Sequence, residues 1–172
     1  HQMHGEFGVL RAESAARLCN STDAFIWRKD NEVLRMAATY GRGLVTGGGW
    51  IPIDRTSAAG RAVVDGQTIH VEDLAASEGE FPWAKDHGIR SGVRTTLVAP
   101  LLREGVAIGA IHIRRWEVRP FTDKQVKLLE TFADKAVIAI ENVRLFKVLE
   151  QRNRDLTEAM GQETETSEVR RV

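Results

Sequence analysis

The apolar and polar positions in the first third of the chain predict a helix followed by a hairpin. Residues 6–19 place their apolar side chains roughly on one helical face. Two runs that suit β-strands follow, over 22–28 and 32–39, and the polar residues between them are typical of a tight turn. We interpret the glycine-rich stretch over 41–49 as a mobile loop, because it lacks the Lys-Ser/Thr ending of a phosphate-binding loop.

The middle of the chain alternates short helices and strands. In chain order, the pattern predicts an extended piece over 51–53, a helix over 58–64, a strand over 67–72, a helix over 83–88, and strands over 94–102 and 106–114. Glu104-Gly105 is a turn signal between the last two strands, so we expect them to pair antiparallel. This order of elements indicates an α+β fold with an antiparallel sheet.

The last third of the chain predicts one long helix that begins near Thr122. Apolar residues recur at alternating spacings of three and four, and the phase of this stripe shifts between Val143 and Phe146. Asn153 occupies an apolar position in the second part of the stripe. A helix of about forty residues is unusually long for a globular domain and indicates a coiled coil or a linker helix. We expect the tail after Gly161 to fray.

Composition and charge narrow the class of protein. The 172 residues fit about one domain, and 42% hydrophobic with 28% charged residues is ordinary for a globular protein. Lys plus Arg and Asp plus Glu both number 24, which argues against a protein that binds nucleic acid. No apolar run reaches the length of a membrane span, and the N-terminus has no signal-peptide pattern. We therefore expect a cytoplasmic protein and no membrane contact by this segment.

Few side chains indicate a catalytic, metal-binding or ligand-binding site. Cys19 is the sole cysteine, which excludes an internal disulfide and a structural zinc site. The histidines lack the spacing of a zinc hydrolase, and we find no catalytic constellation. Arg61 and Arg94 could bind a carboxylate or phosphate, although a solvated arginine or an ion pair is the plainer interpretation.

Histidine, tryptophan and threonine side chains supply further candidates for a pocket. His70 and His112 lie in predicted strands, where each either packs in the sheet or faces a ligand. Trp83 and His87 share one short predicted helix, and Trp83 best suits a ligand wall because it begins that helix after a polar loop. Thr96 lies in the next strand, and small residues near this region leave room for a cavity.

Five segments stand in a consistent order over about residues 10–150. They are Thr68–Leu74, Gly88–Ser91 with Thr96–Leu102, Ile108–Ile111, Pro120–Asp123 and Phe132–Asn142. Together these segments resemble the GAF family, of the type found in bacterial sensor histidine kinases and nucleotide cyclases. The run Glu141–Phe146 and the charged stretch after it look like the signalling helix that leads to an output domain.

The resemblance implies a GAF-like, PAS-related fold. Its central antiparallel sheet has about six strands, with the terminal helices on one face and short helices and loops over a pocket on the other. A long C-terminal helix follows. We expect residues 1–5 to be the remnant of a tag or vector, 6–146 to form the GAF domain, and 147–172 to form a signalling helix or linker with a frayed end.

The same resemblance implies a sensory domain of a multidomain signalling protein in a two-component system, and we expect the isolated domain not to be an enzyme. A small molecule would bind between the sheet and the middle helices, and a homodimer would relay the signal to an output domain in the same parent chain. The expected ligand contacts are Arg61, His70, Trp83, His87, Arg94, Thr96 and His112. The expected dimer contacts are Ile140, Val143, Phe146, Leu149, Asn153 and Leu156.

The ligand and the cofactor stay unknown at this point. The resemblance argues against covalent bilin, because Cys19 lies in the first helix, and against a free methionine sulfoxide reductase, which needs several cysteines. The histidines leave haem binding open, but no feature of the sequence supports it. The sequence pattern of cyclic-nucleotide-binding GAF domains is missing. A ligand-free dimerisation or spacer module is the main alternative, and an enzyme on this scaffold is the third.

Overall fold

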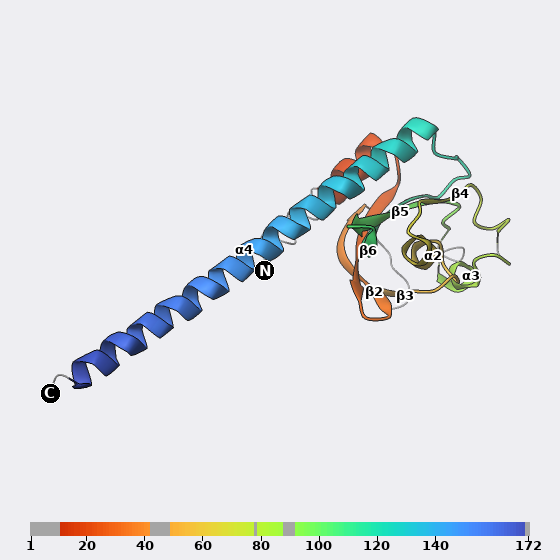
Figure 1. Ribbon diagram of the computed structural model, residues 1–172. Coiled ribbons are helices and arrows are strands. Elements are labelled where there is room, and N and C mark those ends of the chain that lie inside the picture. Colours follow the sequence, from red (N-terminus) through yellow and green to blue (C-terminus); the bar gives the residue numbers. More distant parts are fainter. Residues whose placement is uncertain (1–10, 42–48, 78, 88–91, 171–172) are drawn as a thin grey trace. The chain divides into compact units, whose positions relative to one another are not determined.

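The computed structural model describes residues 11–41, 49–77, 79–87 and 92–170 (Figure 1). A helix over 11–18 comes first. The other elements are β1 (Asp23–Asp30), β2 (Val33–Gly41), β3 (Trp50–Pro52), α2 (Ala58–Asp65), β4 (Ile69–Val71), α3 (Pro82–His87), β5 (Thr95–Arg103), β6 (Val106–Arg115) and α4 (Asp123–Arg170). The tag expected over 1–5, the start of the first helix and most of the glycine-rich loop lie outside the described residues.

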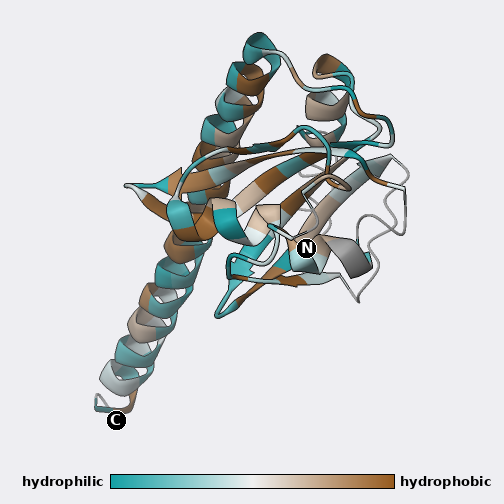
Figure 2. Ribbon diagram, turned by 90° about the vertical axis from the view of Figure 1, so that its right-hand side faces the viewer, coloured by the Kyte–Doolittle hydropathy of each residue, from teal (hydrophilic) through white to brown (hydrophobic). Residues whose placement is uncertain are grey.

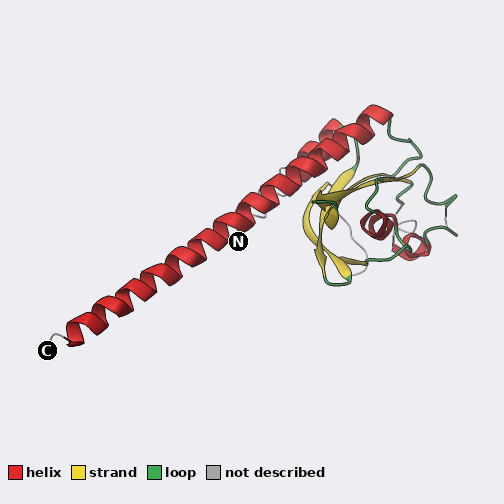
Figure 3. Cartoon of the chain, viewed as in Figure 1, coloured by secondary structure: helices red, strands yellow, loops and turns green. Residues whose placement is uncertain are grey.

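The six strands form one antiparallel sheet in the order β3-β2-β1-β6-β5-β4 (Figure 3). The expected hairpins are present. Asn31 between β1 and β2 has φ 56°, and Glu104 and Gly105 between β5 and β6 have φ 51° and 80°. Two consecutive residues with positive φ, as at Glu104 and Gly105, are typical of the two-residue turns that match the twist of paired strands. The α+β prediction with about six strands is confirmed.

One face of the sheet packs against the first helix and the first turns of α4. Ala12, Ala15 and Ala16 lie on one side of the first helix and are almost fully buried. They meet strand side chains such as Ile111, and Leu129 of α4 joins the same core. Small alanine side chains let the helix approach the sheet closely, so this face is filled by tight helix-on-sheet packing.

The opposite face is covered by α2, α3 and their connections, as Figure 1 shows. Ser57 caps α2, with its Oγ accepting a hydrogen bond of 2.9 Å from the Gly60 N–H. A Cβ added at Gly60 would lie 2.6 Å from the Pro52 carbonyl oxygen, so only glycine permits this approach. The two expected layers, with terminal helices on one face and short helices on the other, are therefore present.

Strand β6 buries charged side chains at the centre of this arrangement. Side chains alternate between the two faces of a strand, so His112 and Arg114 lie toward α2 and α3. Ile113, between them, packs in the core beneath the first helix and α4. Arg115 follows on the helix side and is only 2% exposed.

Arg115 of β6 forms hydrogen bonds to two other segments, the end of the first helix and the residues just before α4. Its guanidinium donates to the carbonyl oxygens of Cys19 at 2.8 Å and Asn20 at 3.0 Å, at the end of the first helix. It also donates to the carbonyl oxygens of Arg119 and Pro120, just before α4. Burial lowers the pKa of Arg115, and the nearby Arg119 charge lowers it further. Arg115 therefore fastens β6 to both helices that cover one sheet face.

The start of α4 agrees with the sequence pattern. The Thr122 Oγ1 accepts from the Gln125 N–H at 3.1 Å, and the Gln125 Oε1 accepts from the Thr122 N–H at 2.9 Å. This reciprocal pair is a capping box. At the other end, α4 continues past Gly161 to Arg170, where we expected fraying, and the Thr164 hydroxyl donates to the Met160 carbonyl oxygen at 2.9 Å.

The chain divides into two compact units, His1–Val137 and Ile138–Val172. The domain boundary after residue 146 stays a prediction. In the first unit, Leu129, Ala133, Ala136 and Val137 of α4 are buried in the core. The second unit is helical as far as Arg170, and most of its side chains are exposed. Figure 2 shows hydrophilic and hydrophobic residues interspersed along α4. The first half of the apolar stripe therefore serves the domain core.

The first prediction concerns Arg115. Arg115→Met should lower the free energy of unfolding by about 3 kcal/mol, because several buried carbonyl oxygens lose their donor at once. Urea unfolding monitored by circular dichroism would measure the change. Arg144→Met is the matched control, since Arg144 is exposed and pairs only locally with Glu141. Equal stability of the two variants would contradict the role assigned to Arg115.

Candidate functional site

A cavity of about 70 Å³ lies between the sheet and the helices α2 and α3. Its walls are mainly apolar and aromatic, with a few polar groups, as in most small-molecule pockets. The apolar and aromatic lining residues are Trp27, Ile51, Ala58, Ala59, Leu74, Trp83, Ala84 and Val93. The polar lining residues are Ser57, His87, Thr96, His112 and Arg114.

His112 forms the polar floor of this cavity. The Trp27 Nε1–H donates to His112 Nδ1 at 3.3 Å, so Nδ1 carries no proton. The neutral ring then bears its proton on Nε2, which donates to the Thr96 Oγ1 at 2.5 Å. Burial lowers the pKa of His112 to about 3, and the adjacent Arg114 charge acts in the same direction. His112 is therefore a neutral donor to Thr96.

Arg114 lines the same cavity and pairs with a buried acid. Asp23 stands opposite Arg114 in the β1–β6 register and is fully buried. Arg114 Nε and Nη2 donate to the two carboxylate oxygens at 2.9 and 2.6 Å, and the guanidinium lies 4.5 Å from the Phe25 ring centroid. A bidentate pair of this kind has strict geometry, so it holds the guanidinium in one orientation.

The aromatic side of the cavity comes from α3. The rings of Trp83 and His87, four residues apart, stack with centroids 3.9 Å apart and an interplanar angle of 7°. His87 Nδ1 lies 2.9 Å from the Trp83 carbonyl oxygen, which sets it as a donor. Trp50 of β3 contacts Trp83 at 5.3 Å between centroids. This stack forms a flat, rigid wall.

The structure brings together four of the seven expected ligand contacts, namely Trp83, His87, Thr96 and His112. The other three have different environments. Arg61 pairs with Glu80 at 2.6 Å and stacks on Phe81. The His70 Nε2 accepts from the Phe121 N–H at 3.1 Å, beside the start of α4. Arg94 donates to the Val93 carbonyl oxygen. These three do not line the cavity.

Sequence reasoning missed Trp27, Ser57 and Arg114 as lining residues. Arg114 could have been predicted as a lining residue, because it stands two positions after His112 and therefore lies on the same face of the strand. Ser57 is also the N-cap of α2. Trp27 also packs in the core and is 2% exposed.

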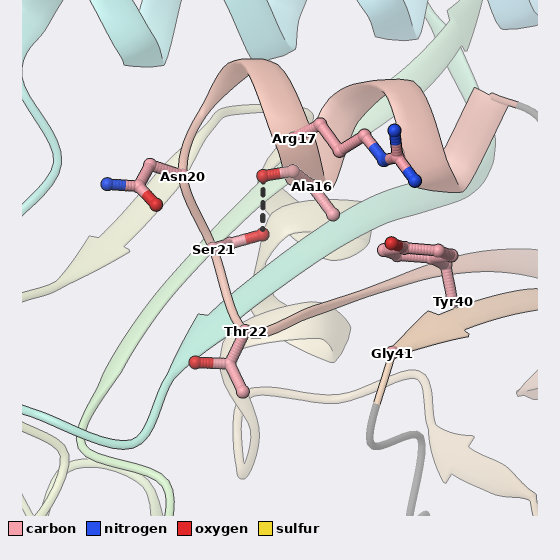
Figure 4. A pocket seen from close by; sticks show the side chains of 7 residues that line it. All are labelled: Ala16, Arg17, Asn20, Ser21, Thr22, Tyr40 and Gly41. Carbon is pink, nitrogen blue, oxygen red and sulfur yellow. Dashed lines mark hydrogen bonds between the residues drawn. The ribbon is translucent and has the colours of Figure 1, made fainter.

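A second hollow on the surface is larger but open, at about 610 Å³ (Figure 4). Ala16, Arg17, Asn20, Ser21, Thr22, Tyr40 and Gly41 line it. Arg17 is 69% exposed and pairs with Glu13 at 2.7 Å, and Figure 4 shows it beside Tyr40. Ser21 Oγ donates to the Asp23 carbonyl oxygen at 3.0 Å. An open hollow whose charged group is exposed and paired is a weak candidate for a ligand site.

Haem does not fit the inner cavity as arranged. Haem ligation needs a free imidazole nitrogen, and both ring nitrogens of His112, one of the two histidines that line the cavity, are engaged. The volume of about 70 Å³ is also below the roughly 150 Å³ of a cavity that holds benzene. Over the described residues, no group of three or more His, Cys, Asp or Glu side chains could hold a metal ion.

The architecture and this cavity define a class of protein. The family model of the GAF domain matches residues 11–141, and the chain belongs to the GAF family. The resemblance inferred from the sequence is thereby confirmed, and the GAF fold is sensory and regulatory. No curated protein matches the sequence.

Several solved structures share this fold. The type II free methionine-R-sulfoxide reductase from Thermoplasma acidophilum has a TM-score of 0.70 at 13% identity, covering 82% of this chain and 94% of its own. A methyl-accepting chemotaxis protein gives 0.69 at 24% identity, covering 83% and 91%. The second GAF domain of DevS from Mycobacterium smegmatis gives 0.66 at 20% identity, covering 84% and 97%.

These comparisons correct one expectation. We predicted that the isolated domain is not an enzyme, yet free methionine-R-sulfoxide reductases are among the structures with this fold. The prediction was wrong in treating the GAF fold and the single cysteine as grounds for excluding catalysis. The fold serves both sensors and enzymes, so function must be argued from the site.

Membrane insertion and compartment are separate questions. Among the described helices, none has a stretch long and apolar enough to cross a membrane. The cytoplasmic location inferred from the sequence stays a prediction.

The second prediction concerns pH. The pKa of His112 is about 3 in the folded protein and about 6.5 when unfolded, so the unfolded state binds the proton more readily between these values. The free energy of unfolding should therefore fall as the pH drops below about 6.5, by up to about 1.4 kcal/mol per pH unit from this residue. Burial also lowers the pKa of His70, which adds to the slope.

Urea unfolding at pH 7, 6 and 5 would measure this slope. His112→Asn should flatten it, whatever its effect on absolute stability, because the variant has no group to protonate at this position. Thr131→Val, on the exposed surface of α4, should retain the slope of the original protein. A His112→Asn variant with an unchanged slope would refute the assignment of a buried neutral imidazole.

Proposed function

We propose that this chain is the sensory domain of a signalling protein, which binds a small molecule in the cavity between β6 and the helices α2 and α3. The observation that carries the proposal is the buried Thr96–His112 pair at the floor of an otherwise apolar cavity. Buried polar groups are costly unless they are paired, so polar groups that border a cavity are suited to ligand contact.

Strand β6 offers a route from this cavity to α4. Arg114 borders the cavity, and the next residue, Arg115, holds the backbone that leads into α4. A ligand that favours one position of β6 would change the carbonyl groups that Arg115 can reach. Such a ligand shifts the population between two arrangements by its difference in affinity for them.

We further propose that the second unit forms a homodimer through its exposed apolar stripe. Phe146, Leu149, Leu156 and Met160 are each about 60% exposed and stand at heptad spacing. Asn153 lies in the same stripe, where a polar residue favours a defined register. Ile140 is 42% exposed, and Val143 is half-buried just before the phase shift. The shift gives the helix two competing registers, which suits a two-state relay.

A ligand-free dimerisation module is the second candidate. It is favoured by the small volume of the cavity, which leaves little room for a ligand. The apolar stripe would serve this module equally well. The content of the cavity therefore separates the two candidates.

The third prediction tests ligand binding. Native mass spectrometry of the purified protein should reveal a small species that denaturation releases. Ala59→Leu fills the cavity and should remove that species, whereas Ala159→Leu, on an exposed position of α4, should retain it. An identical bound species in the Ala59→Leu variant would contradict binding in this cavity.

The fourth prediction tests the dimer stripe. Leu149→Asn should weaken dimerisation at least tenfold, because a buried apolar contact in the stripe becomes polar. Val148→Asn is the matched control, since Val148 is also exposed and apolar but lies off the stripe, and it should leave dimerisation unchanged. Sedimentation equilibrium measures both constants. Equal effects of the two substitutions would argue against this stripe as the interface.

A further inference from the structure

The Thr96 hydroxyl has one hydrogen-bond donor that is not used within the described residues. Thr96 is 3% exposed, and its oxygen accepts the Nε2 proton of neutral His112. A hydroxyl that accepts in this way still has its own proton to donate. Within the described residues, no acceptor for that proton is present, and Thr96 borders the cavity. The cavity therefore receives a buried donor whose direction is set by His112 and Trp27.

Ser57 and Arg114 add donors to the same cavity. The Ser57 oxygen accepts the Gly60 N–H, so its proton is likewise uncommitted within the described part of the chain. Arg114 uses Nε and Nη2 for Asp23, and its Nη1 has no hydrogen-bond partner among the described residues. The three residues that carry these donors line one cavity of about 70 Å³.

Three of the polar side chains that line the cavity thus have an uncommitted donor within the described residues. His112 Nδ1, the ring acceptor, already receives the Trp27 N–H. The Asp23 carboxylate pairs with Arg114 and is not among the residues that line the cavity. A ligand that matches these groups presents acceptor oxygens, and a charged acceptor forms hydrogen bonds about twice as strong as a neutral one.

The size of the cavity and its apolar walls limit the part of the ligand that carries the acceptor group. A cavity of about 70 Å³ holds roughly two water molecules at about 30 Å³ each, and it is less than half the size of a cavity that binds benzene, at about 150 Å³. Ala58, Ala59 and Leu74 form apolar walls beside the donors. This space suits a short hydrocarbon part with very few carbon atoms.

We propose that the cavity binds a short-chain carboxylate. Its carboxylate oxygens accept from Thr96, Ser57 and Arg114 Nη1, and its apolar part lies against the alanine and leucine walls. This inference rests on the proposed function of the cavity and specifies its ligand class. A cavity that merely holds water is the competing interpretation.

Propionate is the probe, and propionamide and propylamine are neutral and cationic molecules of the same size. Binding to the full chain is measured by NMR titration at constant ionic strength set with sodium chloride. Propionate should bind saturably, and propionamide and propylamine should each bind at least tenfold more weakly. Thr96→Val removes the hydroxyl with little change in shape and should weaken propionate binding at least tenfold, whereas Thr131→Val should not alter it.

Ser57→Gly is a second variant in case Thr96→Val fails to fold, because glycine retains most of the helix-capping preference. It should also weaken propionate binding. Equal binding of propionamide and propionate, or unchanged affinity in both variants, would overturn the carboxylate assignment and leave ligand binding by the cavity intact. The absence of binding by all three probes would also overturn it. Native mass spectrometry then shows whether another species occupies the cavity or whether the proposed function fails as well.

Discussion

The fold depends on how strand β6 satisfies two adjacent buried guanidinium groups. A buried arginine is costly unless its N–H groups find partners. Arg114 meets this demand with the Asp23 carboxylate across the sheet, and Arg115 meets it with backbone carbonyl oxygens at the ends of two connections. Since both faces of the sheet are anchored through one strand, the cavity and the base of α4 share a common support.

The same strand explains why the cavity has a defined polarity. Neutral His112 stands between the Trp27 donor and the Thr96 acceptor, so its tautomer is determined by its neighbours. Protonation would break the contact with Trp27 and place a second positive charge beside Arg114. This chain of hydrogen bonds leaves the Thr96 hydroxyl proton uncommitted within the described residues, and the cavity walls beside it are mainly apolar.

The apolar stripe of the long helix α4 runs from a buried part into an exposed part. Leu129, Ala133 and Ala136 pack in the core of their own domain, and the residues from Ile138 onward form a separate unit. Apolar residues recur at spacings of three and four in both parts, although the phase of the stripe shifts between Val143 and Phe146. Periodicity alone cannot distinguish packing within a chain from packing between chains.

The sequence by itself determined the order of the elements, the antiparallel hairpins, the start of α4 and the GAF family. These features follow from local periodicity, turn residues and capping, which act over a few residues. Only the tertiary structure decided that Arg114 joins Asp23, 91 positions away, and that Arg61, His70 and Arg94 lie outside the cavity. Such pairings depend on strand register and on which face each side chain occupies. The sequence records each residue's chemistry but not the distant neighbour that engages it.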